Sequence, residues 1–210
     1  MLKSFIFASS SAGKSAMVKS VAQEFGIQVL DLRDIFPNEK IEILEDQTSY
    51  LGNARKKAQT VYQRTQQLGH DLAVLGDDSG LEVDALSGKP GIFSARYRGL
   101  KNLPPSATDA DRNQALLEEL LPLRTPDSKI TARYVSFLVL ILPDGSEKTV
   151  SSAVPGEILP TPRGEGGFGY DPLFFDPKVK KTYAEFSHAE LMRHGFRVLG
   201  LRKLFAMLQH

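Results

Sequence analysis

The chain contains 210 residues, with 26 lysines and arginines against 25 aspartates and glutamates, and its formal net charge is +1. A chain of this length buries roughly 70% of its unfolded surface, so it needs no disulfide or metal to hold its fold. The absence of cysteine excludes disulfides, thiolate metal sites and a cysteine nucleophile, and the balanced charge provides no overall field that attracts nucleic acid.

Membrane insertion and secretion find no support in the sequence. The longest wholly apolar run, Phe137–Leu142, is far shorter than the roughly 20 residues that a membrane helix needs. The first residues lead into a short apolar run without the small-residue cleavage site of a secretory signal. We therefore expect a cytoplasmic protein that has neither a membrane nor a nucleic acid as its partner.

The first half of the chain alternates short apolar runs with helical patterns. Buried strands are predicted at Phe5–Ala8, Ile27–Leu30, Ile41–Leu44 and Leu72–Leu75. Helices are predicted from Gly13 or Ser15 to Phe25 and from Thr48 to Leu68, each followed by a glycine. The last of these strands delivers Gly76-Asp77-Asp78-Ser79-Gly80 at its carboxyl end, where α/β sheets place their ligands.

The second half is richer in β-structure. Glycines and prolines make Ser87–Leu103 loop-like, and a helix is predicted over Asp109–Leu121. The two β-rich runs Ile130–Leu142 and Glu147–Ile158 flank an Asp-Gly turn, which predicts a hairpin. A short strand is predicted at Leu173–Phe175 and a closing helix at Ala189–Leu208. The pattern predicts a mixed α/β fold in which residues 1–210 form a single domain, with a cleft between two lobes.

Glycine occupies four of the first six positions of the segment Gly164–Pro172, which also contains two aromatic residues and a carboxylate. Glycines allow the backbone to approach other groups closely, and an aromatic face stacks on a planar ring whose edge a neighbouring polar group reads. The alternative is a glycine-rich turn with its aromatic residues packed inward. The segment therefore indicates either a base-binding site or a compact turn.

Asp77 and Asp78 have the composition of a metal and phosphate centre. On an extended strand they point to opposite faces, whereas in a turn they converge. Together with a third carboxylate, Glu45 or Asp46, they suit Mg²⁺, and one aspartate is placed to accept a proton from water. The alternative is an Asx-turn that ends the strand.

Ser9, Ser10, Ser11, Ala12, Gly13 and Lys14 follow a strand and open a helix. Free backbone N–H groups at a helix start favour an anion, and the lysine adds a full positive charge. On the long helix, Asn53 and Lys57 share a face at a spacing of four residues. A loose P-loop pattern, with Ala8 at the first glycine position, leaves a P-loop hydrolase or phosphotransferase as an alternative.

Three blocks in order along nearly the whole chain, Gly76–Leu81, Pro90–Tyr97 and Gly166–Pro172, make it resemble the inosine triphosphate pyrophosphatase family. That family hydrolyses non-standard purine nucleoside triphosphates such as ITP, dITP and XTP. The resemblance implies an elongated, two-lobed α/β fold with a long curved sheet shared by the lobes, usually as a homodimer. It also implies Mg²⁺-dependent cleavage between the α- and β-phosphates, which yields a nucleoside monophosphate and pyrophosphate.

The resemblance assigns roles by position. Asp78 is implied as the general base and a metal neighbour, Glu45 as a metal ligand and Asp77 as a supporting carboxylate. The remaining implied substrate contacts are Ser9 to Lys14, Asn53, Lys57, Ser79, Arg96, Phe168, Gly169, Tyr170, Asp171 and Arg197, with Phe168 as the stacking ring.

The chain departs from the family pattern at several of these positions. Ser9-Ser10-Ser11 stands where the family carries Thr-Gly-Asn, and Leu191 stands at a phosphate-binding lysine. Gly195-Phe196-Arg197 aligns with a base-reading Ser-His-Arg, so only the arginine is kept, with His194 or His188 as nearby substitutes. These departures predict an altered base preference, or else a nucleotide-binding protein without turnover.

Overall fold

A computed structural model describes residues 2–125 and 129–209 of the chain. Within these residues the strands form one seven-stranded mixed sheet in the order β2-β1-β3-β4-β5-β6-β7. β1 runs parallel to β2 and to β3, whereas β6 pairs antiparallel with β5 and with β7. The strands are β1 (Ser4–Phe7), β2 (Gln28–Leu30), β3 (Ala73–Val83), β4 (Thr131–Ile141), β5 (Glu147–Ile158), β6 (Phe174–Asp176) and β7 (Lys181–Thr182).

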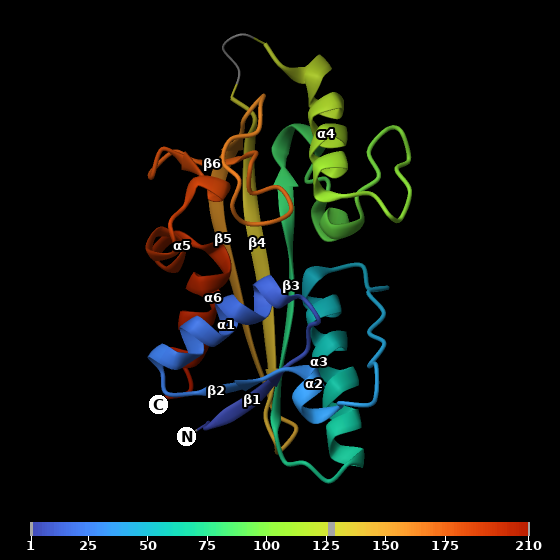
Figure 1. Ribbon diagram of the computed structural model, residues 1–210, viewed down its shortest axis with the longest axis vertical. Helices are drawn as coiled ribbons and strands as arrows, with labels where there is room; N and C mark the ends of the chain where they lie inside the picture. The colour runs from blue at the N-terminus through green and yellow to red at the C-terminus, as the bar shows by residue number, and fades with distance from the viewer. Residues whose placement is uncertain (1, 126–128, 210) are drawn as a thin grey trace. The chain divides into compact units, whose positions relative to one another are not determined.

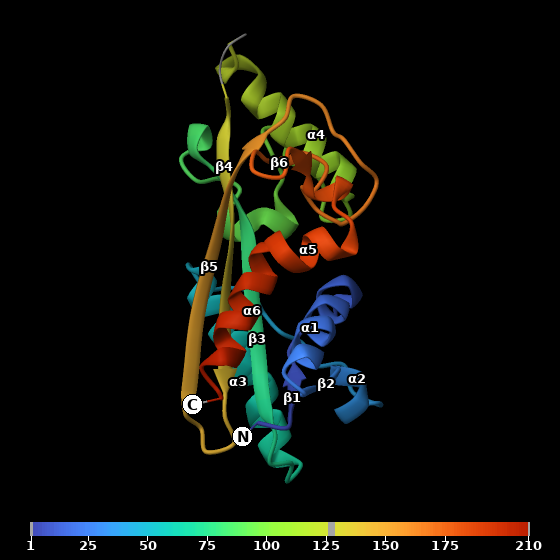
Figure 2. The ribbon, with the colours of Figure 1, turned by 90° about the vertical axis from the view of Figure 1, so that its left-hand side faces the viewer.

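Helices flank this sheet, as Figures 1 and 2 show. They are α1 (Ala12–Glu24), α2 (Leu32–Ile35), α3 (Tyr50–Gln67), α4 (Asp109–Leu120), α5 (His188–His194) and α6 (Phe196–Ala206), with 3-10 turns η1 (Asp84–Leu86), η2 (Gly91–Arg96), η3 (Leu121–Leu123) and η4 (Tyr183–Glu185). The mixed α/β class predicted from the sequence is confirmed.

The chain divides into two compact units. Unit 1 comprises Met1–Asp78, Ser136–Ser152 and His194–His210, and unit 2 comprises Ser79–Val135 and Ala153–Arg193. Each unit is described by itself below. The shared curved sheet and the cleft expected from the sequence stay predictions.

In unit 1 the alternation of strand residues gives the sheet two apolar faces. Ile6 and Val74 pack with Ala54 and Ala58 of α3 in one buried cluster. On the other face Phe5 contacts Phe205 of α6, with ring centroids 5.7 Å apart, and α1 packs against α6. A period of two residues along the strands therefore separates the α3 face from the α1/α6 face.

Gly76 allows α3 to lie unusually close to β3. A Cβ atom built on Gly76 would lie 2.1 Å from the carbonyl oxygen of Ala54 and 2.9 Å from the amide nitrogen of Ala58. These neighbours are backbone atoms of a helix and cannot rotate away. Only glycine fits at this position, and the close approach brings the side chains of the next turn of α3 over β3.

In unit 2, α4 begins at Thr108 with a capping box, since the Thr108 side chain accepts from the Asp111 amide and the Asp111 carboxylate accepts from the Thr108 amide. The core contains an aromatic cluster in which the Tyr134 ring lies 4.4 Å from Phe174 and 5.5 Å from Tyr183, measured between centroids. This cluster supports the start of β6 and the loop that precedes it.

Two sequence predictions on local structure are wrong, and a third, the loop, holds with one addition. Ile41–Leu44 forms no strand, because Ile41 and Ile43 satisfy their alternation by packing on the core cluster without pairing. The predicted C-terminal helix is broken at Gly195, whose extended backbone (φ −62°, ψ 126°) separates α5 from α6. The loop Ser87–Leu103 contains the 3-10 turn η2.

The hairpin prediction is confirmed. β4 and β5 are neighbours in the sheet, and the turn between them closes through bonds from the Gly145 amide to the Leu142 carbonyl and from the Leu142 amide to the Ser146 carbonyl. Gly145 has a φ of +81°, which explains the glycine at this position.

Candidate active site

The two adjacent aspartates lie within β3 and not in a turn after it, which corrects the turn predicted from the sequence. Because strand side chains alternate, Asp77 faces α1 and α6, and Asp78 faces α3. The carboxylates therefore serve two different polar networks, and both networks lie inside unit 1.

On the α3 face, Lys57 joins two carboxylates. Its Nζ lies 2.8 Å from Asp78 Oδ1 and 2.6 Å from Glu45 Oε1, and it also donates to the carbonyl oxygen of Asp77 at 3.1 Å. Asn53 Nδ2 donates to Asp78 Oδ2 at 3.2 Å, and Asn53 Oδ1 accepts from the amide of Gln47. The predicted pairing of Asn53 and Lys57 on one helix face is confirmed by these shared contacts.

Glu45, and not Asp46, is the acid that joins this network. Its side chain is 33% exposed, whereas that of Asp78 is 7% exposed, so the network runs from the surface into the protein. Asp46 instead pairs with Lys56 at the surface. The sequence did not decide which of these two acids is the third carboxylate, and the contact with Lys57 distinguishes them.

Burial and charge act in opposite directions on these groups. Burial raises the pKa of Asp78 above its usual range, and Lys57 only partly offsets this effect. Burial also disfavours the charged form of Lys57, but Asp78 and Glu45 outweigh it and raise the pKa of the ammonium. Lys57 is therefore a fixed cation between two carboxylate oxygens.

On the α1/α6 face, Asp77 is the centre of a second network. Its Oδ2 lies 3.0 Å from Lys14 Nζ and accepts from Arg197 Nε at 3.1 Å, while Oδ1 accepts from Ser136 Oγ at 3.0 Å. The side chains of Asp77 and Arg197 are 0% and 1% exposed, and that of Lys14 is 20% exposed. Burial opposes ionisation of Asp77, but Arg197, Lys14 and Lys57 hold its pKa well below the usual range.

The loop before α1 ends in a helix cap. Ser11 is the N-cap residue, and its Oγ accepts from the amide of Lys14, while Ser9 Oγ accepts from the amide of Ser11. Ser10, Ala12 and Gly13 are exposed. The first turn of α1 carries no acidic residue, so the positive end of the helix dipole is left uncompensated by its own side chains.

Two of the three predicted metal ligands suit a divalent cation. Carboxylate oxygens of Glu45 and Asp78 both converge on one cation, the Lys57 ammonium, and Mg²⁺ is commonly held by one or two such oxygens together with waters and phosphates. Asp77 fits this role poorly, because both of its oxygens already accept from protein donors. Among the described residues no group of three His, Cys, Asp or Glu side chains gathers as a complete metal site.

In unit 2 the segment Gly164–Pro172 forms a loop that displays one aromatic ring. Phe168 is 41% exposed. The amide of Phe168 donates to Asp171 Oδ2 at 3.0 Å, and the amide of Gly169 donates to Asp109 Oδ2 at 2.7 Å. The Gly169 carbonyl accepts from Asn113 Nδ2 at 3.0 Å, so α4 binds both the N–H and the C=O of Gly169.

Steric constraints fix the same loop. Gly167 has a φ of +71°, and a Cβ built on it would lie 2.2 Å from Asp171 Oδ2. On the other side of the loop, the Gly166 amide donates to the Ala184 carbonyl, and the Ala184 amide donates to the Asp171 carbonyl. These contacts therefore fix the loop backbone at Phe168 and leave the side chain exposed.

The structure gives Tyr170 and Asp171 contacts inside the protein. Tyr170 is buried, and its hydroxyl donates to the Ser94 carbonyl at 3.0 Å. Asp171 Oδ1 accepts from the Tyr134 hydroxyl at 2.9 Å, and its other oxygen accepts from the amide of Phe168. These bonds shape the loop, and the substrate contacts implied for both residues stay predictions.

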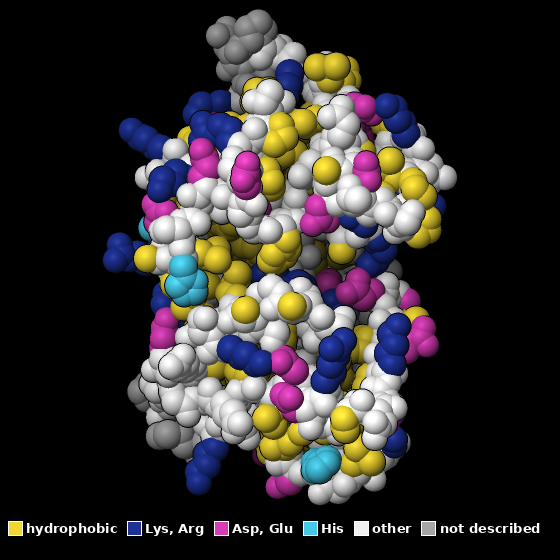
Figure 3. Space-filling view, in the orientation of Figure 1, with side chains coloured by type: hydrophobic (Ala, Val, Ile, Leu, Met, Phe, Trp, Pro, Cys, Tyr) yellow, Lys and Arg dark blue, Asp and Glu magenta, His cyan; other side chains and the backbone are white. Residues whose placement is uncertain are grey.

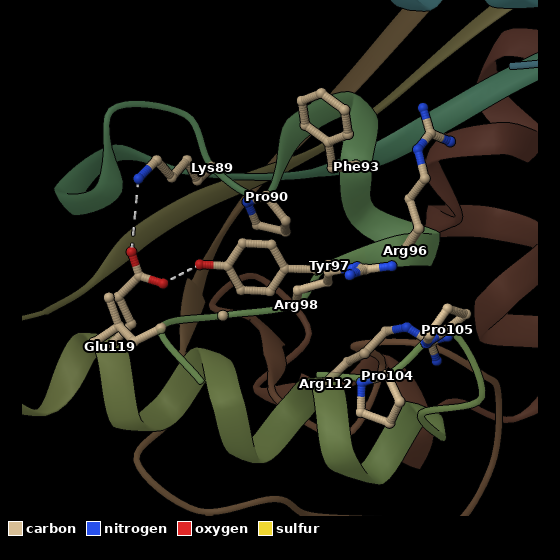
Figure 4. Close-up of a pocket in the computed structure, with 12 residues that line it drawn as sticks. Lys89, Pro90, Phe93, Arg96, Tyr97, Arg98, Pro104, Pro105, Arg112 and Glu119 are labelled. Carbon is tan, nitrogen blue, oxygen red and sulfur yellow. Dashed lines mark hydrogen bonds and ion pairs between the residues drawn. The ribbon is translucent and has the colours of Figure 1, made fainter. Parts of the chain in front are cut away.

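Arg96, another implied substrate contact, lines a pocket of about 700 Å³ within unit 2. Its guanidinium carbon lies 5.2 Å from the centroid of the Phe93 ring. Figure 4 shows Tyr97 and Lys89 directed toward Glu119, with which both interact. Basic side chains, Glu119 and apolar side chains line this pocket. The role of Arg96 toward a substrate stays a prediction.

The structure locates the residues near the C-terminus that depart from the family pattern. Phe196, at the family histidine position, is buried, and its ring lies 4.9 Å from the guanidinium carbon of Arg197. His188 is exposed at the start of α5, and His194 ends that helix. Leu191 and Ser79 are half-buried. Arg197 itself contacts Asp77, so its implied contact with a base stays a prediction.

Sequence reasoning missed three residues that the structure places in these networks. Ser136 lies on β4, 59 residues from Asp77, and its apolar neighbours gave no signal of a polar contact. Asp109 and Asn113 lie on α4 and bond to the backbone of Gly169. Asp109 was recognisable only as a residue of the predicted helix start, a role that does not indicate its distant partner.

Charged side chains of both signs are mixed over the face shown in Figure 3. This distribution agrees with the formal net charge of +1. No helix among the described residues is long and apolar enough to cross a membrane.

The fold and the polar networks define an α/β protein with an open mixed sheet, in which two buried carboxylates on β3 pair with basic side chains of the flanking helices. The sequence pattern of the Ham1 family matches residues 5–207. The chain therefore belongs to the Ham1 family.

Relatives and solved structures agree with this assignment. A dITP/XTP pyrophosphatase of Thermus thermophilus is 41% identical over 202 residues, which cover 95% of this chain and 88% of the relative. One of Clostridium perfringens is 36% identical over 97% of this chain and 96% of its own. The structure of a HAM1 protein from Coxiella burnetii has a TM-score of 0.81 at 31% identity and covers 100% of this chain and 99% of that one.

Proposed function

We propose that this protein hydrolyses nucleoside triphosphates with non-standard purines, such as ITP, dITP and XTP, to the nucleoside monophosphate and pyrophosphate. The relatives named dITP/XTP pyrophosphatases support this substrate class. The observation that carries the proposal is the convergence of Glu45 and Asp78 on Lys57. Carboxylates and fixed cations together are the groups that phosphate-transfer sites use.

In the proposed reaction Asp78 is the general base. It accepts a proton from water as the water oxygen bonds to phosphorus and the bond between the α- and β-phosphates breaks, so that pyrophosphate leaves. Lys14, Lys57 and the loop from Ser9 to Gly13 bind the phosphate oxygens, with Ser79 as a further contact. Glu45 and Asp78 would hold Mg²⁺, which supplies neutralisation of phosphate charge when bound.

Phe168 is the proposed stacking partner of the base. Because hydrogen bonds already order the loop backbone, stacking of the exposed ring on a purine costs little loop entropy, and such stacking is worth about 1–3 kcal/mol. The loss of the family histidine at Phe196 removes a group that reads the edge of the base, so we propose a broader base preference than a Ser-His-Arg site provides. We also propose a cytoplasmic homodimer, on the resemblance alone.

The test is a substrate profile read by product. The protein is incubated with Mg²⁺ and, in turn, ITP, dITP, XTP and the four standard triphosphates, and pyrophosphate and orthophosphate are measured separately. We expect pyrophosphate, and the lack of its release from every substrate would overturn the proposal. Orthophosphate or a phosphorylated acceptor would instead indicate a P-loop phosphotransferase.

A nucleotide-binding protein without turnover is the second candidate function. Leu191 and Phe196 favour it, because they replace a lysine and a histidine of the family pattern. A lost charge-assisted bond costs about 1.5–3 kcal/mol, which weakens the binding of triphosphate but leaves the Asp78 network intact. Calorimetry that detects nucleotide binding, with no product in the assay above, would select this alternative.

A further inference from the structure

Asp77 connects four parts of unit 1 that are distant in sequence. Lys14 comes from α1, Ser136 from β4 and Arg197 from α6, and all three contact the Asp77 carboxylate from β3 at 3.0–3.1 Å. Arg197 lies 120 residues from Asp77 in sequence. The carboxylate is fully buried, so each of its hydrogen bonds replaces one that water makes in the unfolded chain.

Two basic side chains in this network share one carboxylate. Lys14 and Arg197 both pair with Asp77, and burial, together with the nearby Arg197 and Lys57, lowers the pKa of Lys14 although Asp77 acts in the opposite direction. Arg197 is enclosed, whereas the Lys14 side chain is 20% exposed at the first turn of α1. Of the two, Lys14 is therefore the side chain that a ligand can reach, beside the exposed residues Ala12 and Gly13 of the helix start.

Packing gives Arg197 little freedom to turn elsewhere. Its guanidinium carbon lies 4.9 Å from the Phe196 ring centroid, and its Nη1 lies 3.9 Å from Met17 Sδ. Because Met17 belongs to α1, Arg197 contacts the helix that carries Lys14 as well as the carboxylate that pairs with Lys14. The arginine thereby links α6 to the start of α1.

We propose that Asp77, Ser136 and Arg197 are positioning residues that hold the Lys14 ammonium for an incoming triphosphate. In this assignment Asp77 is not a metal ligand and Arg197 does not read the base. The inference rests on the proposed function, because it takes Lys14 as a phosphate contact. It adds to that function by moving two residues from metal and base recognition to the phosphate end of the site.

The test uses a probe without a base. Binding of inorganic tripolyphosphate and of ITP is measured by calorimetry in the presence of EDTA, so that neither metal nor turnover contributes. We expect Arg197→Met to weaken both ligands by the same factor, about tenfold. If Arg197 reads the base, its replacement should weaken the binding of ITP alone, and that result would overturn the proposal.

Ser136→Ala removes one hydrogen bond from Asp77 without a change of charge. We expect tripolyphosphate binding to weaken about three- to tenfold, and we expect no such effect in a Lys14→Met background, since Ser136 acts through Lys14. Equal weakening in both backgrounds would overturn the proposal. Ser152→Ala is the matched control, because Ser152 Oγ donates to the Phe196 carbonyl and not to Asp77.

Two readouts separate this proposal from misfolding and from failure of the proposed function. Arg197→Lys keeps the charge and should recover part of the affinity that Arg197→Met loses, and circular dichroism monitors the fold of each variant. The wild-type product assay tests the proposed function independently. Wild-type protein that binds tripolyphosphate yet releases no pyrophosphate would remove the enzymatic function and leave the positioning role of Asp77 standing.

Discussion

The network on β3 and the loop Gly164–Pro172 use opposite means to fix their side chains. On β3, charged side chains from distant segments surround Asp77 and Asp78, which are buried. In the loop, Asp109, Asn113 and Asp171 bond to backbone groups.

The difference follows from the chemistry each region presents. A charge removed from water needs several partners, so the aspartates are enclosed by donors. A stacking ring needs an open face, so the Phe168 loop is held through its backbone, and the ring itself stays 41% exposed. The comparison predicts that substitution of a buried aspartate on β3 disturbs a charged network, whereas removal of the exposed Phe168 ring affects recognition more than stability.

The largest effect is expected at Asp78. Asp78→Asn removes the proposed base but keeps an oxygen for Lys57 and an isosteric shape, so we expect activity to fall about 10²- to 10⁴-fold with the fold intact. Pyrophosphate release and thermal unfolding provide the measurements. Asp46→Asn is the matched control, because Asp46 is exposed and pairs with Lys56 outside the network. Full activity in Asp78→Asn would show that the base is assigned wrongly.

The two regions also differ in what their glycines do. Gly76→Ala places a Cβ 2.1 Å from a helix carbonyl, and we expect it to lower the free energy of unfolding by more than about 3 kcal/mol. Gly169→Ala meets no atom within 4 Å but has a φ of +62°, so we expect a cost of about 1–2 kcal/mol. Urea denaturation measures both values, and a larger loss for Gly169→Ala would contradict the comparison.

Phe168→Ala tests recognition separately from stability. Removal of the exposed ring should raise KM for ITP about tenfold, since stacking on a base is worth about 1–3 kcal/mol, and leave the thermal midpoint unchanged. Binding of tripolyphosphate should not change, because that ligand has no base. A drop in stability would mean instead that the ring is part of the packing of unit 2.

The smallest effect is expected at an exposed ion pair of unit 2. Lys181, with the amide and hydroxyl of Ser187, lowers the pKa of Glu190 to about 2. A lowered carboxyl pKa stabilises the fold above the ordinary pKa of the group, and this contribution is lost as the pH falls toward 2. In Lys181→Met the Glu190 pKa measured by NMR should rise; an unchanged value would show that the Ser187 bonds alone lower it.

Local sequence patterns predicted most of the helices and strands. The strand–loop–helix start at Ser9–Ser15, the Asp144-Gly145 hairpin and the helix over Asp109–Leu121 all depend on short-range chemistry that is readable in sequence. The predicted strand Ile41–Leu44 failed because its alternation is met by packing on the core, which no local signal distinguishes from strand pairing. The prediction of one continuous C-terminal helix failed at Gly195 for a similar reason, since glycine occurs both within helices and at their ends.

The sequence by itself determined the α/β class, the identity of the chemical groups, and the shared helix face of Asn53 and Lys57, because these depend on composition and on periods of two and 3.6 residues. Only the tertiary structure decided that Asp77 and Asp78 serve opposite faces of β3, that Glu45 and not Asp46 joins Lys57, and that Arg197 binds Asp77 across 120 residues. Such contacts depend on how close distant segments come, and that distance is set by packing such as the approach of α3 to Gly76.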